Sequence, residues 1–232
     1  MSTPSRQDYP QMAAARGRIE PAPRRVRGFR GAEPVFDTTS ARYVWEVPYY
    51  PQYFVPLSDV RADVLREGLP GMRVFDDGDF AGLVRFRWDT LNWFEEDEPI
   101  YGHPRNPYVR VDALRSHRHV QVAMNGAILA ETHCPVLLFE TGLPTRYYID
   151  RTAVEFGYLE PSSTQTLCPY KGVTSRYWSV RVADTLVADL AWSYETPLPA
   201  VASIANMVAF YNERVDITVD GIELARPATH FS

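Results

Sequence analysis

The sequence predicts a mostly β protein built from two tandem β domains with short helices. Aromatic residues make up 13% of the 232 residues, and a high aromatic content favours strands. Apolar and polar residues alternate in the runs that flank Asn125-Gly126, a dipeptide typical of a tight hairpin turn. The chain also contains an internal repeat, which predicts that one fold is used twice.

The repeat pairs each residue from 26 to 65 with the residue 94 positions later, without a gap. Glu46 pairs with Glu140 in this alignment, at the end of an apolar run in each copy. Further on, residues 110–112 (Arg-Val-Asp) recur at 214–216, a spacing of 104 that makes the second copy ten residues longer. We therefore expect a basic N-terminal tail at 1–25, a diverged first β domain at 26–118 and a second β domain at 119–228.

The elements follow from local signals along the chain. The tail region carries an arginine cluster (Arg16, Arg18, Arg24, Arg25, Arg27 and Arg30), which either grips a partner or, as we favour, packs partly on the body. Acidic runs at 76–79 and 95–98 are expected to be solvated loops. In the second copy, strands are expected at 120–124, 127–132, 136–140, 146–149, 175–182, 186–194, 207–211 and 215–219, with a closing turn at 220–221. Thr152 and Glu155 form a capping box that predicts a helix ending near residue 159, matched by a helix at 58–68 in the first copy, and 199–206 is a further short helix.

Composition limits the function. The net charge of −5 does not favour nucleic-acid binding, and no apolar run reaches the ~18 residues of a membrane span. Two cysteines, Cys134 and Cys168, are too few for a disulfide framework, and no zinc-ligand spacing is present. We expect a cytoplasmic protein without a signal peptide, metal or cofactor, and a homodimer is a possible assembly.

The segment Cys168-Pro169-Tyr170-Lys171-Gly172 is the centre of the candidate site. The chain has 24 cationic residues of which 23 are arginine, so Lys171 is its single lysine. A lysine amine changes its pKa readily on burial and can act as a base or a nucleophile, which arginine does not do. A simpler interpretation is a tight turn in which Pro169 fixes φ, Gly172 supplies a positive φ and Lys171 is solvated.

Glu140 is the proposed partner of Lys171. A buried carboxylate must be paired or protonated, so Glu140 either ties down Arg146 or backbone amides structurally or faces Lys171 as an acid–base pair. Cys168 is either a nucleophile activated by the nearby lysine or a small buried side chain. The candidate binding residues are Arg146, Tyr148, Tyr170, Tyr177, Trp192 and Tyr194, with Tyr147 and Tyr211 as further possible wall residues, and the aromatic residues could equally be core.

A set of ordered motifs resembles a known family. The motifs are residues 139–140 (Phe-Glu), 146–149 (Arg-Tyr-Tyr-Ile), 166–172 (Thr-x-Cys-Pro-Tyr-Lys-Gly), 192–197 (Trp-x-Tyr-x-x-Pro) and 209–211 (Ala-Phe-Tyr). Together they resemble domain-of-unknown-function family 427, also labelled nucleotidyltransferase-like, in its bacterial two-copy form. The resemblance covers residues 26–226 and implies a small β-tent domain used twice. No Gly-Ser followed by an Asp-x-Asp metal pair and no phosphate-binding glycine loop supports the nucleotidyltransferase label.

Two classes of function remain open. The first is a cofactor-independent enzyme that acts on a small polar organic molecule in a pocket around Lys171 and Glu140. The second is a non-catalytic ligand-binding or structural module. In either class the partner that we expect is a small-molecule ligand.

Overall fold

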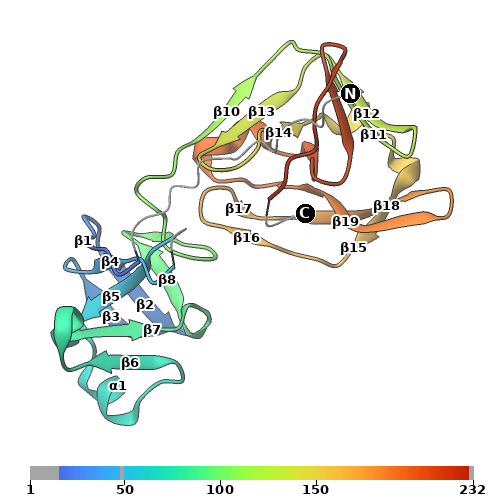
Figure 1. Ribbon diagram of the computed structural model, residues 1–232. Coiled ribbons are helices and arrows are strands. Elements are labelled where there is room, and N and C mark those ends of the chain that lie inside the picture. The colour runs from blue at the N-terminus through green and yellow to red at the C-terminus, as the bar shows by residue number, and fades with distance from the viewer. Residues whose placement is uncertain (1–15, 48–49, 230–232) are drawn as a thin grey trace. The chain divides into compact units, whose positions relative to one another are not determined.

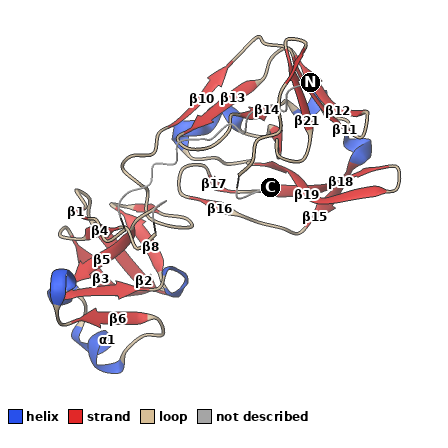
Figure 2. Cartoon of the chain, in the orientation of Figure 1, coloured by secondary structure: helices blue, strands red, loops and turns tan. Residues whose placement is uncertain are grey.

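The computed structural model describes residues 16–47 and 50–229, and these form antiparallel β-sheets joined by short helices and turns (Figures 1 and 2). The prediction of a mostly β protein is therefore confirmed. Contacts between Cα atoms separate two compact units, with the division between Tyr108 and Val109. We call the described residues up to 108 the N-terminal unit and those from 109 the C-terminal unit. Within the described residues, no helix is long and apolar enough to cross a membrane.

The N-terminal unit contains two sheets and one α-helix. Sheet order is β1-β4-β5-β7-β6 in the first sheet and β3-β2-β8-β9 in the second. The strands are β1 (Ile19–Pro21), β2 (Val26–Arg30), β3 (Glu33–Thr38), β4 (Arg42–Val44), β5 (Gln52–Pro56), β6 (Met72–Phe75), β7 (Leu83–Phe86), β8 (Asn92–Glu95) and β9 (Glu98–Pro99), with α1 (Ala62–Glu67) and 3₁₀ turns at Leu57–Asp59, Gly78–Phe80 and Trp88–Thr90.

The C-terminal unit contains four sheets. Their orders are β10-β13-β14, β12-β11-β21-β22, β15-β18-β19-β20 and the short pair β16-β17. The strands are β10 (Val111–Arg115), β11 (Val120–Met124), β12 (Ala127–Thr132), β13 (Val136–Glu140), β14 (Arg146–Tyr148), β15 (Leu159–Ser162), β16 (Leu167–Cys168), β17 (Gly172–Val173), β18 (Arg176–Val182), β19 (Thr185–Ser193), β20 (Val208–Phe210), β21 (Asp216–Val219) and β22 (Ile222–Glu223), with 3₁₀ turns at Arg151–Ala153, Phe156–Tyr158 and Pro199–Ile204.

The strand pairing of the two units agrees at the predicted offset of 94. The β2–β3 and β11–β12 hairpins have the same register and a β-bulge at the same position, after Gly28 in one and Val122 in the other (28 + 94 = 122). The pairing of β4 with β5 matches that of β13 with β14 residue for residue. Strand β1, in the region expected to be tail, pairs with β4 as β10 pairs with β13. Residues 1–15 of the expected tail lie outside the described residues.

The predicted spacing of 104 near the end of the repeat is wrong. Gly28 pairs with Trp93 on β8, whereas its counterpart Val122 pairs with Ile217 on β21, so the final strands are 124 residues apart (217 − 93 = 124). The C-terminal unit therefore gains thirty residues (124 − 94 = 30), not ten. The strand register shows where most of the thirty additional residues lie. Met72 pairs with Phe86 in the N-terminal unit as Ala191 pairs with Phe210 in the C-terminal unit. Met72 and Ala191 are therefore equivalent, at an offset of 119 (191 − 72). An insert of 25 residues (119 − 94) thus lies between Val154 and Ala191, and it carries the Cys-Pro-Tyr-Lys-Gly segment.

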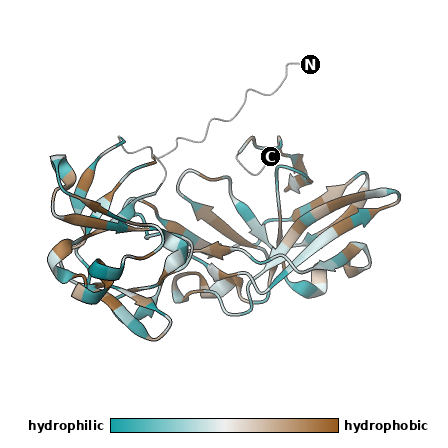
Figure 3. Cartoon of the chain, turned by 90° about the horizontal axis from the view of Figure 1, so that it is seen from below, coloured by the Kyte–Doolittle hydropathy of each residue, from teal (hydrophilic) through white to brown (hydrophobic). Residues whose placement is uncertain are grey.

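Turn chemistry explains both hairpins that close on a glycine. Asn125 and Gly126 have φ values of 49° and 79°, which confirms the predicted turn with both residues at positive φ. Asp220 and Gly221 have φ values of 51° and 80° and close the β21–β22 hairpin as predicted. Figure 3 shows brown and teal along the same arrows, so strands of the protein carry hydrophobic and hydrophilic residues together.

The helix predicted after Thr152 is wrong. Asp150, rather than Thr152, caps the segment, because its carboxylate accepts a hydrogen bond from the Thr152 amide at 2.9 Å. The amide of Glu155 then donates to the Leu129 carbonyl at 2.8 Å, which draws the chain into pairing with β12. Two 3₁₀ turns replace the helix. The equivalent segment of the other unit keeps a short α-helix, α1, although it begins at Ala62 rather than residue 58.

The predicted solvated loop at 95–98 is wrong at its first residue. Glu95 ends β8 and is only 3% exposed. Its carboxylate accepts a hydrogen bond from the Tyr53 hydroxyl at 2.8 Å and is paired with Arg24 and, at 3.1 Å, with Arg105. The carboxylate is therefore an internal anchor of the N-terminal unit, and Arg24 of the arginine cluster binds to it.

Candidate functional site

The Cys168–Gly172 segment is a short hairpin loop within the insert. Cys168 pairs with Gly172 across β16 and β17, and Gly172 has a φ of 98°, which confirms the predicted role of this glycine in a tight turn. The hairpin is locked at its base, because the Thr174 side chain accepts from the Thr166 amide at 2.7 Å. These contacts fix the backbone from which Lys171 projects.

Lys171 points inward and not into solvent. Its ammonium forms an ion pair with the carboxylate of Glu140 at the end of β13. The two side chains are only 13% and 9% exposed. The interpretation of Lys171 as a solvated turn residue is therefore wrong, although the turn itself is present. Strand β13 supplies the carboxylate and the insert supplies the amine, so residues 31 positions apart meet at one point.

The electrostatics of the cluster keep the lysine charged. Burial by itself lowers the pKa of Lys171, but the charge of Glu140 and the nearby Cys168 and Tyr148 groups outweigh it and raise the pKa above its ordinary value. The amine is thus an ammonium near neutral pH. An ammonium donates hydrogen bonds and attracts anions, but it has no lone pair with which to attack a carbonyl group.

Aromatic residues lie beside this ion pair, with Tyr148 and Tyr194 close enough to interact with its charges. Tyr148, Tyr177, Trp192 and Tyr194 are between 0% and 6% exposed and pack in one hydrophobic cluster. The Trp192 indole donates to the Tyr148 hydroxyl at 3.2 Å. Burial raises the pKa of Tyr148 to about 12 and also raises that of Tyr194. These phenols therefore stay neutral near pH 7, and the ammonium and the carboxylate meet no charged phenolate.

The hydroxyls of the tyrosine wall are largely committed to one another. The Tyr177 hydroxyl lies 3.1 Å from the Tyr211 hydroxyl and 3.1 Å from Oγ1 of Thr166. These contacts connect β18 to the residue after β20 and to the base of the loop hairpin. The aromatic residues are thus core, as one of the two interpretations of the sequence held.

Cys168 and Tyr170 lie at the outer edge of the cluster, where both are partly exposed. Cys168 is close enough to Lys171 to raise the pKa of the amine. Two of the histidines that could activate a thiol have other neighbours: His119 stacks on His133 with ring centroids 4.3 Å apart and contacts Glu131 at 2.7 Å. The accessible edge of the site therefore consists of the loop and Glu140.

Arg146 belongs to a different network, which sequence reasoning missed. Its guanidinium makes a bidentate pair with Glu213, with N–O distances of 2.6 and 2.8 Å, and donates to Asn212 at 3.2 Å. Thr229 also donates to Glu213, at 2.6 Å. The guanidinium lies 5.8 Å from the ring centroid of Trp192, so Arg146 reaches the aromatic cluster without pairing with Glu140. A polar Asn-Glu pair directly after the buried strand β20 was the available signal.

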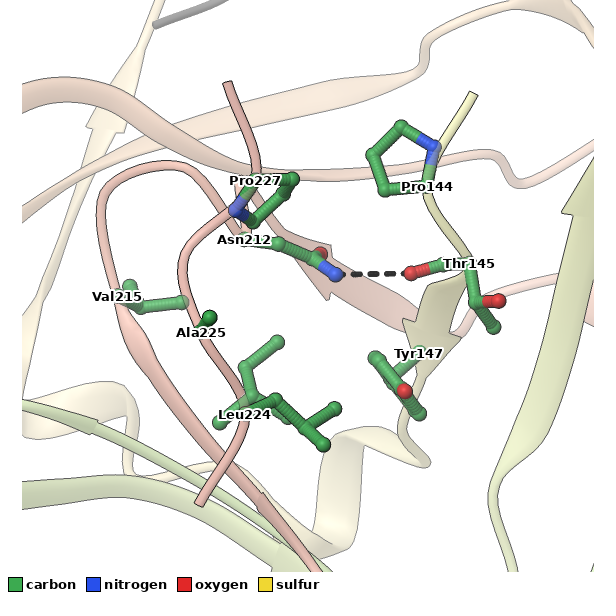
Figure 4. A pocket seen from close by; sticks show the side chains of 9 residues that line it. Pro144, Thr145, Tyr147, Asn212, Val215, Leu224, Ala225 and Pro227 are labelled. Atoms are coloured by element: carbon green, nitrogen blue, oxygen red, sulfur yellow. Dashed lines mark hydrogen bonds between the residues drawn. The ribbon is translucent and has the colours of Figure 1, made fainter. Parts of the chain in front are cut away.

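The structure contains a pocket that, of the candidate residues taken from the sequence, only Tyr147 lines. Its volume is about 260 Å³. It lies in the C-terminal unit between the start of β14, the turn before β21 and the segment after β22 (Figure 4). The lining residues are Pro144, Thr145, Tyr147, Asn212, Val215, Ile217, Leu224, Ala225 and Pro227.

The N-terminal unit has a counterpart of the Glu140 carboxylate. Glu46, the residue at the equivalent position, lies 2.7 Å from Nε of Arg85 on β7. The residue equivalent to Arg85 is Ala209 (85 + 124 = 209), which is fully buried on β20. The two units thus neutralise an equivalent carboxylate from different elements, a strand in one and the inserted loop in the other.

A comparison with protein families agrees with this architecture. Residues 18–70 and 112–221 match the family described as a domain of unknown function (DUF427). Since these segments make up more than half of the chain, the protein belongs to this family. The second matched segment includes the insert and Lys171. No curated protein sequence matches the chain.

Proposed function

We propose that the C-terminal unit binds a small polar organic molecule at the edge formed by Lys171, Glu140, Cys168 and Tyr170. In this proposal the Lys171 ammonium donates a hydrogen bond to an oxygen of the ligand, and Glu140 holds the ammonium in place. If the protein is an enzyme, Lys171 and Glu140 would act as acid and base, and Cys168 at the margin of the site would be the candidate nucleophile.

The ion pair between Lys171 and Glu140 is the observation that carries the proposal. Moving two charges out of water costs several kcal/mol per ion, and well-packed apolar residues often replace such a pair without loss of stability. The pair is made by the only lysine of the chain, on an insert that the other unit lacks. A buried ion pair that depends on a lysine present in one unit alone, and that lies next to partly exposed loop residues, is typical of a binding site.

The raised pKa of Lys171 favours one of the two chemistries that the sequence left open. A Schiff base requires a neutral amine, and the surroundings of Lys171 favour the ammonium. The role that we propose is therefore a charge clamp or a proton donor. A ligand with a carboxylate or carbonyl oxygen would share the ammonium with Glu140.

A structural module is the alternative, and the pairing of the tyrosine hydroxyls favours it. The hydroxyls of Tyr148 and Tyr177 have partners inside the protein, so these two groups are not left open for a ligand. In that case the ion pair does no more than fasten the inserted loop to β13.

The single lysine makes a direct experiment possible. Selective labelling with ¹³C,¹⁵N-lysine yields one side-chain NMR signal, which belongs to Lys171. We expect this signal to shift saturably on addition of acetate, pyruvate or acetamide. In Glu140→Gln, where the ammonium has lost its counter-charge, acetate should bind at least about tenfold more tightly than in the wild type, which corresponds to ~1.4 kcal/mol.

Two outcomes would decide against binding. Amine hydrogens that exchange with water only over hours, together with no response to any of the three compounds in the wild type or in Glu140→Gln, would establish a closed structural pair. Trapping of pyruvate on Lys171 by borohydride would instead contradict the charged role and favour Schiff-base chemistry. Glu46→Gln in the N-terminal unit is the matched control and should leave the lysine signal unchanged.

A further inference from the structure

The pocket beside β14 and β21 is best understood by comparing the two units. Trp93 pairs with Gly28 in the N-terminal unit as Ile217 pairs with Val122 in the C-terminal unit. Trp93 and Ile217 are therefore equivalent residues, and Ile217 lines the pocket. A bicyclic indole in one unit is a four-carbon side chain in the other.

A second pocket residue also replaces a tryptophan. Residues 87–90 and 211–214 form equivalent turns, each closed by a backbone hydrogen bond from its last amide to its first carbonyl, at 3.2 and 2.9 Å. The second residue of the turn is Trp88 in the N-terminal unit and Asn212 in the C-terminal unit (88 + 124 = 212). Asn212 lines the pocket as well.

The two tryptophans form a stack in the N-terminal unit. The rings of Trp88 and Trp93 are 4.8 Å apart between centroids and inclined by only 3°. Trp93 also stacks on Tyr53, with centroids 6.0 Å apart and an inclination of 26°. The equivalent of Tyr53 is Tyr147 (53 + 94 = 147), which remains in the C-terminal unit and lines the pocket. The C-terminal unit thus keeps the tyrosine ring, as Tyr147. It has no counterpart of the two indole rings that stack next to Tyr53 in the N-terminal unit.

The size and lining of the pocket define what fits. Its volume is about 260 Å³, whereas an apolar cavity of ~150 Å³ is enough for benzene. Seven of the nine lining residues are Pro, Tyr, Val, Ile, Leu or Ala, and none carries a charge. Asn212 donates to the Thr145 carbonyl at 2.8 Å, as Figure 4 shows, and its amide nitrogen has a second proton.

The pocket can be reached from solvent through the segment after β22, because Leu224 and Ala225 are exposed. Arg226 in the same segment is fastened to Asp216 at 2.6 Å, and the Leu224 amide donates to the Ile217 carbonyl at 2.8 Å. The wall next to the opening is therefore held in place.

We propose that this pocket binds an uncharged planar aromatic molecule of one or two rings, which stacks on Tyr147 where the other unit places its own indoles. Asn212 would contact a polar atom on the rim of the ring. The site shares no residue with the Lys171 cluster, and it stands or falls independently of the function proposed for that cluster.

Methyl NMR of the full chain tests the proposal with indole as the probe and with phenol and cyclohexanol as a pair that differs in planarity. We expect indole to shift the methyl signals of Val215, Ile217 and Leu224 upfield in a saturable way. A dissociation constant on the order of 1 mM or tighter is expected for about nine non-hydrogen atoms. Cyclohexanol should bind at least about fivefold more weakly than phenol.

Two variants fill the pocket from two of its lining positions. Ala225→Trp places an indole at the exposed wall, and Ile217→Trp restores the residue of the other unit. Each should weaken indole binding at least about tenfold, while Ile222→Trp, on the exposed edge strand β22, should change it less than about twofold. Methyl shifts that stay linear up to the solubility of indole, equal binding of phenol and cyclohexanol, or undiminished binding by a folded Ala225→Trp variant would overturn the proposal.

Discussion

Removal of the Lys171 amine should destabilise the C-terminal unit strongly. In Lys171→Met the side chain keeps a similar length but the carboxylate of Glu140, 9% exposed, loses its counter-charge. Breaking a buried ion pair by removing one partner costs ~3–5 kcal/mol, because the remaining charge is left unpaired. We therefore expect a loss of this size in the free energy of unfolding.

The double variant Lys171→Met/Glu140→Leu should recover most of this loss. Replacing both members of a buried pair by apolar residues of similar volume is often neutral or stabilising. We expect the free energy of unfolding to return to within about 1 kcal/mol of the wild type. Recovery would mean that stability does not explain why the pair is present.

The assay must report the C-terminal unit separately, because a chain with two units need not unfold in one step. Incorporation of 5-fluorotryptophan gives one ¹⁹F signal for each of the five tryptophans. Trp178 and Trp192 report the C-terminal unit, and Trp45, Trp88 and Trp93 serve as the internal control in the other unit. Urea titrations followed by the two sets of signals then yield separate unfolding curves.

The pH dependence supplies a further check on the same pair. A folded-state pKa above the unfolded value means that the stabilisation is fully present below the unfolded pKa of ~10.4 and is lost as pH rises through the higher folded pKa. The stability difference between the wild type and the double variant should therefore be constant near neutrality and shift against the wild type above about pH 10.4. A cost below ~1 kcal/mol for Lys171→Met would refute the reasoning, since that is the range of solvated surface pairs.

Three further predictions concern stability. Gly126→Ala should cost about 1–2 kcal/mol, because Gly126 has a φ of 79°, whereas Gly157→Ala, which has equal space for a Cβ and no positive φ, should be neutral or slightly stabilising in thermal unfolding. Gly28→Val should cost about 1–3 kcal/mol, because a Cβ at Gly28 would lie 2.3 Å from Phe36, and Gly28→Val with Phe36→Ala should together cost less than the sum of the two single changes in the same assay. Glu213→Gln should weaken the dependence of stability on pH in the acid range. Burial raises the pKa of Glu213, but the hydrogen bonds and charge of Arg146 outweigh it and lower the pKa. The stabilisation is therefore present above the ordinary pKa of ~4.3 and is lost as pH falls through the lower folded pKa. An unchanged acid transition in that variant would contradict the assignment.

Local signals were sufficient for most of the β elements. Alternation placed β11, β12 and β18 to within a residue or so, and the Asn125-Gly126 dipeptide requires a positive φ at both positions, so the hairpin could be inferred without tertiary information. The capping box at Thr152 failed because two longer-range facts override local propensity. Asp150 is a competing cap, and the Glu155 amide finds its partner on β12.

Partners distant in sequence could not be predicted. No local sequence signal indicates that Arg146 pairs with Glu213 rather than with Glu140. None indicates that Glu95, within an acidic run, is buried and accepts a hydrogen bond from Tyr53. Each assignment depends on which strands are neighbours. The loop of Lys171 was recognised from a composition anomaly, the single lysine, and its contact with Glu140 was one of the alternatives that the sequence left open.

The low identity of the two copies has a physical explanation in exchanged volumes. Gly28 is paired with Phe36 in the N-terminal unit, whereas the equivalent pair in the C-terminal unit is Val122 with Ala130. The N-terminal unit pairs a glycine with a large side chain, whereas the C-terminal unit pairs two side chains of smaller and more similar size. The core stays filled and both residue types change, so a repeat of strand pairing survives where sequence identity does not.

The same comparison indicates which part of the C-terminal site is shared and which is new. Both units place a glutamate at the end of the same apolar segment, and in the N-terminal unit Arg85 on a core strand neutralises it. In the C-terminal unit that strand position is Ala209, which would leave Glu140 without a cation, and the insert brings Lys171 to it from another direction. A cation on a strand is fixed by the fold, whereas a cation on a loop can be placed, exposed or withdrawn by changes in the loop alone. The carboxylate is thus the common element, and the specific chemistry of this protein is to be sought in the inserted hairpin that carries its single lysine.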